Sequence, residues 1–459
     1  MMRPCKLAAA FAVPLLMSAC AGHQASSTSQ VVEPKQVVDH FANMAHAMYA
    51  DSLQAATQLN KSIDVFLATP TQANLDAAKA AYAQARVPYQ QSEVLRFDVE
   101  NGHVTEGLDA DGGLASIDAW EGQVNAWPLD EALIDYVSGS YEGEYNSPKN
   151  IINSTGVFTV GGQSIDISTI TPELIAGMNE IGGAEANVTS GVHAIEFLLW
   201  GQDLNGTGPG AGARPVSDYY TDSSQGACTS GDKKSDYKIC QRRAQYLKAA
   251  ADLLVSDLQA MEAEWTPAAG AKKGTLRNDF LTRGDGLQRI LDSMGDMAIG
   301  ELASERMKVA ILFGSTEDEH DCFSDLTHIA IYNNAMGVVD AYRGSYARLD
   351  GSVVSGPSIA DLVAHHNPAL KQQMDEHMSL IESRMRAIVD KAEAKSGGKK
   401  FDQLVGGSAE DKKLVLDAAA ALVSLEEPLS EGVSKVLALS LQEFDAGTCP
   451  TEDVGDCES

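Results

Sequence analysis

Residues 37–67 read VVDHFANMAHAMYADSLQAATQLNKSIDVFL, and this stretch indicates a helical protein. Its apolar side chains recur mainly at spacings of three and four, which is the pattern of one face of an amphipathic helix. These side chains are Val38, Phe41, Ala45, Met48, Leu59, Ile63 and Phe66. Pro70 and the polar residues after it predict a turn. The alanine-rich stretch from about Leu75 to Ala85 predicts a second helix, with a kink at Pro88.

The same helical spacing recurs along the rest of the chain. Further helices are expected at about 115–124, 129–137, 184–199, 242–263, 284–313, 324–342, 358–394 and 411–442. Residues 156–160 and 163–167, joined by Gly161 and Gly162, predict a small β-hairpin. The predicted fold class is therefore all-α with a minor β-hairpin insertion.

The length of 459 residues exceeds what one ordinary core supports, so two packed helical-bundle domains are expected. We place the N-terminal bundle at 36–265 and the C-terminal bundle at 266–445, followed by an acidic, cysteine-containing tail at 446–459. The alanine-rich run from Asp76 towards Pro88 also resembles a later one, which leads from Asp417 to Pro428. This faint repeat indicates a duplication, although two alanine-rich helices also resemble each other through composition alone.

The first nineteen residues differ in character from the rest. A short basic region is followed by an apolar stretch from Leu7 to Met17, and small residues come just before Cys20. This order is typical of a lipoprotein signal peptide, residues 1–19, with Cys20 as the lipidated first residue of the mature chain. A plain signal peptide or an uncleaved anchor is the alternative. Residues 20–35 then read as a polar tether, and Ala21 after the cysteine favours the outer membrane.

The composition is acidic, since 64 Asp and Glu against 34 Lys and Arg give a formal net charge of −30. Because the phosphates would be repelled, nucleic acid is excluded as a partner. No stretch after the signal segment is apolar enough to span a bilayer, so membrane contact is expected through the lipid anchor only. The expected location is the cell envelope, as an outer-membrane lipoprotein that faces the periplasm or the cell surface.

The cysteines predict two local disulfides in an oxidising compartment. Cys228 and Cys240 lie twelve apart around a polar loop, and Cys449 and Cys457 lie eight apart in the C-terminal tail. Cys322 is left over in this scheme, as a buried thiol or as a sign that the pairing differs.

The segment Gly191-Val192-His193-Ala194-Ile195-Glu196 carries the main candidate for chemistry. His193 and Glu196 are three residues apart in a strongly helical run, so both side chains lie on one face and can reach a single metal ion. Imidazole with carboxylate suits iron, zinc or manganese. The alternative is a structural or capping hydrogen bond. However, the apolar residues 197–200 follow directly, and an uncompensated carboxylate beside a core helix would be costly.

The same segment argues against one class of enzyme. Inverted zinc peptidases need His-x-x-Glu-His, in which both histidines bind the metal and the glutamate activates water. Position 197 is Phe, so the second imidazole is missing and a hydrolytic site would need remote ligands. The leading expectation is therefore a protein without enzymatic activity.

A second polar segment, residues 317–328, concentrates carboxylates with two histidines and a thiol. Its candidate binding residues, for a cation or another ligand, are Glu319, His320 and Asp325. The alternative is an acidic loop that caps a helix beginning near Ser324. Taken singly, Glu93 and Asp130 elsewhere in the chain read as surface or capping residues.

Together these features resemble the imelysin family, and within it the iron-regulated protein A branch. Gly191, His193 and Glu196 match the family's Gly-x-His-x-x-Glu pattern. The matching segments extend over about residues 36–445, and they include residues 86–89, 127–131, 304–307 and 317–328. Leu326 departs from the family pattern, which has Asn there.

The resemblance implies a two-domain, all-helical bundle fold with a site near the domain junction. It also implies an exported bacterial protein linked to iron uptake, and some members have been described as metallopeptidases. The metal ligands that it implies are His193, Glu196, Glu93 and Asp130. The motif or binding residues that it implies are Gly191, Arg86, Glu319, His320 and Asp325.

The leading hypothesis is a non-enzymatic envelope lipoprotein that serves iron uptake by binding a metal ion or an iron-containing ligand. Iron is the expected ion, with zinc as the alternative, and an outer-membrane transport protein is the expected partner. Two other functions stay open. One is a metallopeptidase that uses His193 and Glu196 with remote ligands. The other is an interaction scaffold for an outer-membrane iron transporter, in which residues 191–196 are structural.

Overall fold

Helix α1 (Pro34–Ala68) is the helix that the apolar spacing of residues 37–67 predicts. Its start is defined by a capping box, in which the backbone N–H of Glu33 donates to the side chain of Gln36. Pro34 occupies the first turn, where its missing N–H costs no hydrogen bond. The apolar face is buried along the whole helix, which indicates that tertiary packing stabilises it.

The computed structural model describes residues 31–95, 115–138, 147, 149–314, 316, 319–441 and 444. Within the described residues, the chain from Val32 onward forms one compact unit. The predicted signal peptide, Cys20, Cys449 and Cys457 lie outside these ranges, so the lipidation and the second disulfide stay predictions. No helix within the described ranges is long and apolar enough to cross a membrane.

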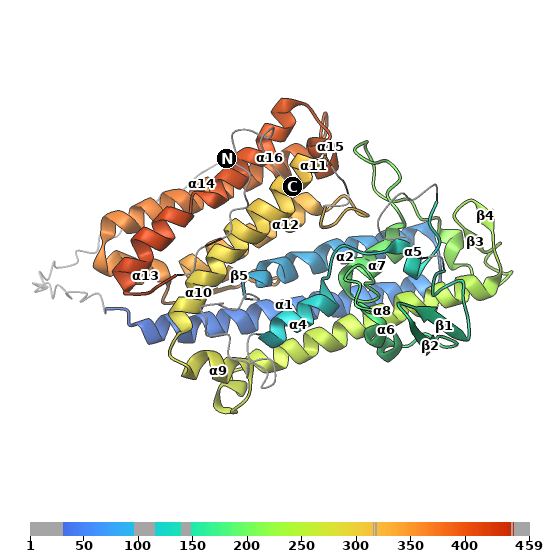
Figure 1. Ribbon diagram of the computed structural model, residues 1–459, viewed down its shortest axis with the longest axis horizontal. Helices are drawn as coiled ribbons and strands as arrows, with labels where there is room; N and C mark the ends of the chain where they lie inside the picture. Colours follow the sequence, from blue (N-terminus) through green and yellow to red (C-terminus); the bar gives the residue numbers. More distant parts are fainter. Residues whose placement is uncertain are drawn as a thin grey trace, which may run out of the picture. The chain divides into compact units, whose positions relative to one another are not determined.

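A first group of helices surrounds α1. It packs against α2 (Gln72–Ser92) and α8 (Tyr237–Trp265), and Figure 1 shows these three helices alongside one another. Helix α2 begins after Thr71, whose side chain accepts from Asn74 N, and it continues through Pro88 into the 3₁₀ turn η1 (Glu93–Leu95). Helix α7 (Gly191–Trp200) packs against both α2 and α8.

A second group contains the helices that follow residue 285. Helix α10 (Gly286–Gly295), the π-helix η4 (Asp296–Lys308) and α11 (Val309–Phe313) form one continuous helical run, as the sequence predicts. The π-helix packs against α12 (Thr327–Arg343) and α16 (Ala409–Val423), and α14 (Pro368–Ala392) packs against the same two helices.

Helix α12 also packs against α2, and this contact joins the two groups. The approach is close at Gly337, where a Cβ atom would lie 2.4 Å from the carbonyl oxygen of Gln91. Only glycine allows the two helices to come this near. The predicted domain boundary at 265/266 falls directly after α8, and the two-domain division and the duplication stay predictions.

The predicted hairpin is confirmed. Strand β1 (Val157–Val160) pairs antiparallel with β2 (Gln163–Asp166), and Gly161 and Gly162 form the turn with positive φ angles. Two further hairpins are smaller and were not predicted. They pair β3 (Thr229–Ser230) with β4 (Lys233–Lys234) and β5 (Ser345–Ala347) with β6 (Val353–Ser355). The fold is therefore all-α with minor hairpin insertions.

The predicted disulfide between Cys228 and Cys240 is present, and it encloses the β3–β4 hairpin.

The shorter helical elements complete the described fold. They are α4 (Ala115–Val124), α5 (Glu131–Ile134), α6 (Pro172–Met178), η2 (Val216–Tyr219), η3 (Ala269–Ala271), α9 (Leu276–Thr282), α13 (Ile359–His366), α15 (Phe401–Val405), η5 (Pro428–Val433) and α17 (Ser434–Leu437).

Several predicted helices prove shorter or divided. The stretch predicted at 129–137 contains only α5, and the helix predicted at 184–199 begins at Gly191 instead. The stretch 358–394 is divided at Asn367, whose side chain accepts from Leu370 N and so caps α14. Helix α16 ends at Val423, before Pro428, which has no N–H to donate. Apolar spacing thus located these helices but did not fix where they begin and end.

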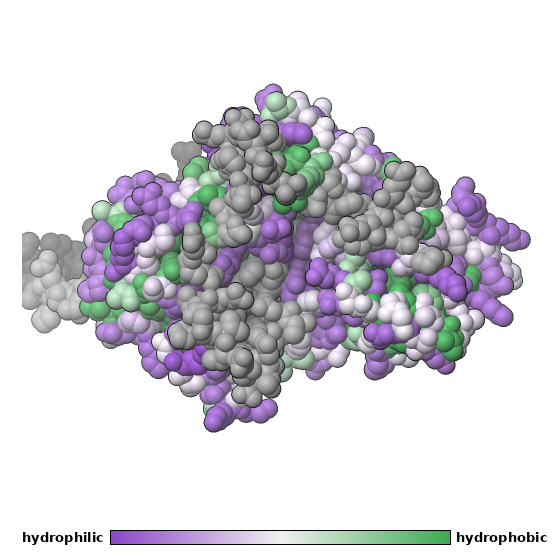
Figure 2. Space-filling model, viewed as in Figure 1, coloured by the Kyte–Doolittle hydropathy of each residue, from purple (hydrophilic) through white to green (hydrophobic). Residues whose placement is uncertain are grey.

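Hydrophilic residues predominate on the face of the molecule shown in Figure 2, and hydrophobic residues form small separate areas there. This surface agrees with the excess of acidic residues in the composition. The buried apolar residues form a continuous core that includes Phe66, Tyr82, Phe197 and Met307.

Candidate metal centre

The glycine of the Gly-x-His-x-x-Glu pattern has a backbone role. Gly191 is the first residue of α7 and has a φ of 78°, which an L side chain rarely adopts. A Cβ atom on it would also lie 2.5 Å from the carbonyl oxygen of Val124, at the end of α4. Glycine therefore lets the start of α7 lie directly against the end of α4. All ten residues of α7 are buried, so its polar side chains face protein rather than water.

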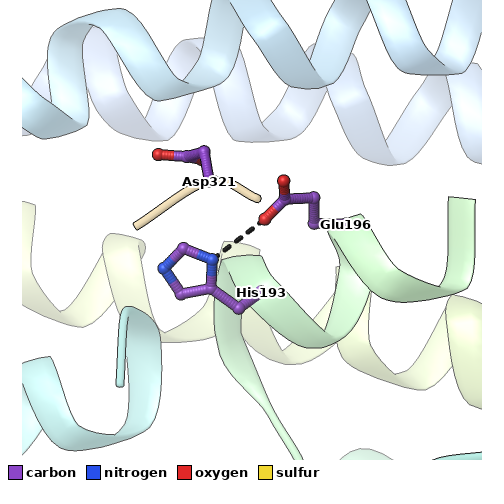
Figure 3. A group of neighbouring side chains, drawn as sticks. All are labelled: His193, Glu196 and Asp321. Carbon is purple, nitrogen blue, oxygen red and sulfur yellow. Dashed lines mark hydrogen bonds and ion pairs between the residues drawn. The ribbon is translucent and has the colours of Figure 1, made fainter. Parts of the chain in front are cut away.

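His193 and Glu196 lie on one face of α7, as their spacing predicts. The Nδ1 atom of His193 is 3.0 Å from Oε2 of Glu196, and both side chains are 0 % exposed. Figure 3 shows the two side chains joined by this interaction. The hydrogen bond that the structural alternative requires is thus present, and the buried environment makes it strong.

Asp321 completes a group of three with His193 and Glu196. It lies in the loop between α11 and α12, and each of the three residues offers one ligand atom within 4.8 Å of the others. Figure 3 shows Asp321 entering from this loop, opposite α7. Among the described residues, this is the group of His, Cys, Asp and Glu side chains whose ligand atoms come this close together. We call it the His193 group.

The two carboxylates of the His193 group are held by donors from other elements. Oε1 of Glu196 accepts from the backbone N–H of Ser324 at 2.9 Å and from its hydroxyl at 2.6 Å. Asp321 accepts from Arg86 of α2 through Nε at 2.8 Å and Nη2 at 3.0 Å, a bidentate arrangement, and from the hydroxyl of Tyr82 at 3.2 Å. These contacts fix both carboxylates before any ligand arrives.

Arg86 extends this support further. Its Nη1 donates to Oδ1 of Asn125 at 2.7 Å, and Nδ2 of Asn125 lies 3.1 Å from Nε2 of His320. The ring of His320 packs edge-on against His193 at 4.8 Å between centroids, and Trp127 does so at 5.0 Å. The imidazole of His193 is thereby held in one orientation.

Burial and neighbouring charges decide the ionisation of the group. Burial, together with the positive charge of Arg86, lowers the pKa of His193 to about 3, so the imidazole is neutral at pH 7. Burial and the charge of Asp321 raise the pKa of Glu196 well above its usual range. Burial acts in the same direction on Asp321, but the adjacent Arg86 holds the pKa of Asp321 below its usual value. A neutral imidazole is the form that binds metals.

One atom of the group has no hydrogen-bond partner among the described residues. This atom is Nε2 of His193, which is fully buried. An unpaired polar atom in this position costs free energy, and a ligand at that nitrogen would offset the cost. One imidazole and two carboxylates form a donor set that suits iron, zinc and manganese. The residues present therefore fit a transition-metal ion.

Glu93 and Asp130 do not belong to the His193 group. Glu93 accepts from Nη2 of Arg306 at 2.7 Å, and Asp130 lies at the start of α5 and accepts from the hydroxyl of Ser147 at 2.6 Å. Each is thus engaged in another contact of the fold, and a metal-ligand role for either stays a prediction.

The remaining predicted residues lie around the group rather than in it. Arg86 positions Asp321, His320 packs on His193, and Gly191 shapes the start of α7. Glu319 and Asp325 come from the same loop as Asp321, but they are not part of the group. Asp321 itself was not among the predicted ligands. It is one of several acidic residues in the segment 317–328, and no periodicity in a loop separates it from its neighbours.

The fold and this site define a helical-bundle protein with a buried His/Glu/Asp candidate metal centre. The sequence profile of the imelysin family matches residues 45–429, and the chain belongs to this family. Iron-regulated protein A of Synechococcus elongatus is 22 % identical over 432 residues, which cover 92 % of this chain and 90 % of that protein.

Two solved structures share the fold. One is described as an iron-regulated protein A precursor from Parabacteroides distasonis, with a TM-score of 0.54 and 17 % identity, covering 88 % of this chain and 94 % of that one. The other is an imelysin-like protein from Psychrobacter arcticum, with a TM-score of 0.50 and 14 % identity, covering 89 % of this chain and 96 % of that one.

Proposed function

We propose that this protein binds a metal ion, with iron as the physiological ion, through His193, Glu196 and Asp321. The observation that carries the proposal is the His193 group itself. Its three ligand atoms lie within 4.8 Å of one another in a buried setting, and Nε2 of His193 has no hydrogen-bond partner among the described residues. A bound ion would supply a positive charge between two carboxylates, and among the described residues Asp321 is the one of the two that is paired with an arginine.

We further propose that this binding serves iron uptake at the cell envelope, with Cys20 as the lipid anchor. The name of the Synechococcus elongatus relative, iron-regulated protein A, supports a role related to iron. The arrangement at the start of the sequence supports export and lipidation. If Cys20 is lipidated, Cys20→Ala moves the protein from the membrane fraction to the soluble fraction. A protein that stays with the membrane after this change is anchored in another way.

The residues around the group have separable roles in this proposal. His193, Glu196 and Asp321 would hold the ion, and Arg86 and Ser324 would keep the two carboxylates in place. Trp127 packs against His193, and Phe323 packs behind it with 5.6 Å between the two ring centroids, so apolar surface would limit the contact of the site with water. Such outer contacts strengthen metal binding by holding the ligands in advance.

The test is metal binding by the purified mature chain, prepared without a His tag or chelators. Elemental analysis identifies a co-purifying ion, and titration with Fe²⁺, Zn²⁺ and Mn²⁺ gives the affinities. We expect one ion per chain and a loss of binding of about 100-fold or more in the double variant His193→Ala with Glu196→Ala. His365→Ala is the matched control, because His365 is exposed on α13.

Two results would contradict the proposal. One is the absence of Fe²⁺, Zn²⁺ and Mn²⁺ binding at micromolar concentration, and the other is unchanged binding in the double variant. Chelator-sensitive cleavage of an unfolded protein, abolished by Glu196→Gln, would favour the metallopeptidase alternative. A double variant with a lower melting temperature and no metal effect would favour the scaffold alternative.

A further inference from the structure

The hydroxyl of Tyr82 lies against the His193 group, although the group does not depend on it for support. Tyr82 is fully buried on α2, and its hydroxyl is 3.2 Å from Oδ1 of Asp321. One turn further along the same face of α2, Arg86 already holds Asp321 through two hydrogen bonds. The position of Asp321 is therefore fixed without the hydroxyl of Tyr82.

The oxygen of Tyr82 has lone pairs without a partner. Its hydroxyl donates to Asp321, and no group within the described part of the chain donates to it in return. Nε2 of His193 is likewise without a hydrogen-bond partner among the described residues. Buried polar atoms are normally paired, so two unused acceptors beside one group of ligands indicate a place for a cation.

The spacing around Tyr82 suits a shared ion. Two ligands that are each about 2.0–2.2 Å from one ion lie roughly 3 Å apart when they take neighbouring coordination positions. The 3.2 Å between the oxygens of Tyr82 and Asp321 corresponds to this separation. The ligand atoms of Glu196 and Asp321 lie within 4.8 Å of each other. An ion bound to Asp321 can therefore reach the oxygen of Tyr82 as well.

We propose that Tyr82 is a fourth ligand of the ion in the His193 group and that its oxygen makes the site prefer Fe³⁺ to Fe²⁺ and Zn²⁺. This inference rests on the metal binding proposed for His193, Glu196 and Asp321. Tyrosine oxygen is a ligand that iron accepts in proteins. On binding, the O–H bond of Tyr82 breaks, a bond between its oxygen and the ion forms, and the proton leaves to water.

The charge of the site explains the preference for Fe³⁺. Without an ion the proton stays on Tyr82, because burial and the charges of Glu196 and Asp321 raise the pKa of the hydroxyl well above its usual value. Fe³⁺ brings one more positive charge into this buried site than Fe²⁺ does, and loss of the phenol proton compensates for it. The phenolate also gains more from Fe³⁺, because the attraction grows with the product of the charges.

Absorption spectroscopy of the full mature chain, titrated with ferric citrate, tests the proposal. A phenolate bound to Fe³⁺ absorbs visible light by charge transfer, and resonance Raman spectra excited in this band show tyrosine ring vibrations. We expect both signals in the wild type. Tyr82→Phe keeps the ring and its edge-on contact with Trp200. In this variant the band should disappear and the Fe³⁺ affinity should fall by about 100-fold or more, while the Zn²⁺ affinity changes by less than about tenfold.

Tyr346→Phe is the matched control. Tyr346 is buried, its hydroxyl donates to Asp51 at 3.0 Å, and Asp51 is paired with Arg348. This arrangement repeats the one around Tyr82, but it contains no histidine and is not part of the His193 group. The visible band and the Fe³⁺ affinity should be unchanged in Tyr346→Phe. Retained Zn²⁺ binding in Tyr82→Phe shows that the variant is folded.

The outcomes separate this inference from the proposed function. A wild-type chain that binds Fe²⁺ or Zn²⁺ but gives no visible band with Fe³⁺ overturns the role of Tyr82 and leaves the metal centre standing. An unchanged band and equal Fe³⁺ affinity in Tyr82→Phe overturn it as well. Equal losses of Zn²⁺ and Fe³⁺ binding in that variant would assign the hydroxyl to holding Asp321 alone, which also contradicts the inference. A wild-type chain that binds none of these ions overturns both proposals.

Discussion

Two buried charged groups in this molecule differ by a single positive charge. In the first, which we call the Asp135 network, Asp135 accepts from Arg243 at 2.6 and 3.0 Å and from Arg214 at 2.7 Å. Arg214 also contacts Asp218, so two carboxylates face two guanidinium groups. In the His193 group, Asp321 is paired with one arginine among the described residues, Arg86, and Glu196 lies beside the neutral imidazole of His193.

The ionisation of the carboxylates follows this difference. Burial alone would raise the pKa of Asp135, but Arg243 and Arg214 hold it below its usual value. Burial and Asp321 instead raise the pKa of Glu196. Two guanidinium groups thus face two carboxylates in the Asp135 network, whereas one guanidinium faces two carboxylates in the His193 group, where the metal ion proposed above would supply the missing charge. Four predictions test this contrast, in order of decreasing effect.

Removing the carboxylate of Asp135 from the Asp135 network should have the largest effect on stability. Asp135→Ala leaves Arg214 and Arg243 buried without their main partner, and we expect the free energy of unfolding to fall by about 3–5 kcal/mol. Urea denaturation at pH 7 measures this. Because its pKa is lowered on folding, Asp135 stabilises the fold above pH of about 4 and loses this effect as the pH falls further. The difference between variant and wild type should therefore shrink in acid. A loss below about 1 kcal/mol at pH 7 would show that the network is not structural.

Changing Arg86, the arginine that is paired with Asp321 of the His193 group, should act mainly on metal binding. Arg86→Lys keeps the charge but removes the bidentate contact with Asp321, so we expect the affinity for Fe²⁺ or Zn²⁺ to fall by about 10–100-fold. Titration calorimetry measures the loss. Arg384→Lys, at an exposed arginine of α14, is the control. Equal affinity in Arg86→Lys and wild type would show that Asp321 needs no positioning.

Deleting one hydroxyl from the Asp135 network should have a smaller effect. The hydroxyl of Tyr136 donates to Asp218 at 2.6 Å, and Asp218 retains its contacts with Arg214 and Thr229 in Tyr136→Phe. We expect a loss of about 1 kcal/mol in the free energy of unfolding, with metal affinity unchanged. Thermal or urea denaturation checks the first part. A change in metal affinity would mean that the two groups are coupled.

The smallest effect on stability is expected for a change in the His193 group, because negative charge is already in excess there. In Glu196→Gln the amide can still accept from Ser324 and donate to His193, while a buried acid is removed. We expect the metal-free protein to change by less than about 1 kcal/mol in free energy of unfolding, although metal binding is lost. A destabilisation as large as that of Asp135→Ala would erase the contrast between the two groups.

Much of the secondary structure could be predicted because it depends on neighbours in the chain. The spacing from Val38 to Phe66 predicts α1, and the glycine pair 161–162 predicts the β1–β2 hairpin. The ends of helices were less predictable. The helix predicted from 184 begins at Gly191, because the chain there adopts a positive φ beside the backbone of Val124. That close contact belongs to the tertiary structure and leaves no periodic mark in the sequence.

The sequence by itself determined that the protein is helical, that it matches the pattern of the imelysin family, and that His193 and Glu196 share one helix face. These are properties of spacing along a single helix, where geometry follows from residue number. Only the tertiary structure decided that Asp321, which comes from a loop more than a hundred residues later, lies beside this pair, and that Arg86 of α2 holds it there. Such groupings depend on which segments pack together, and residue types in loops are too alike to reveal this packing in advance.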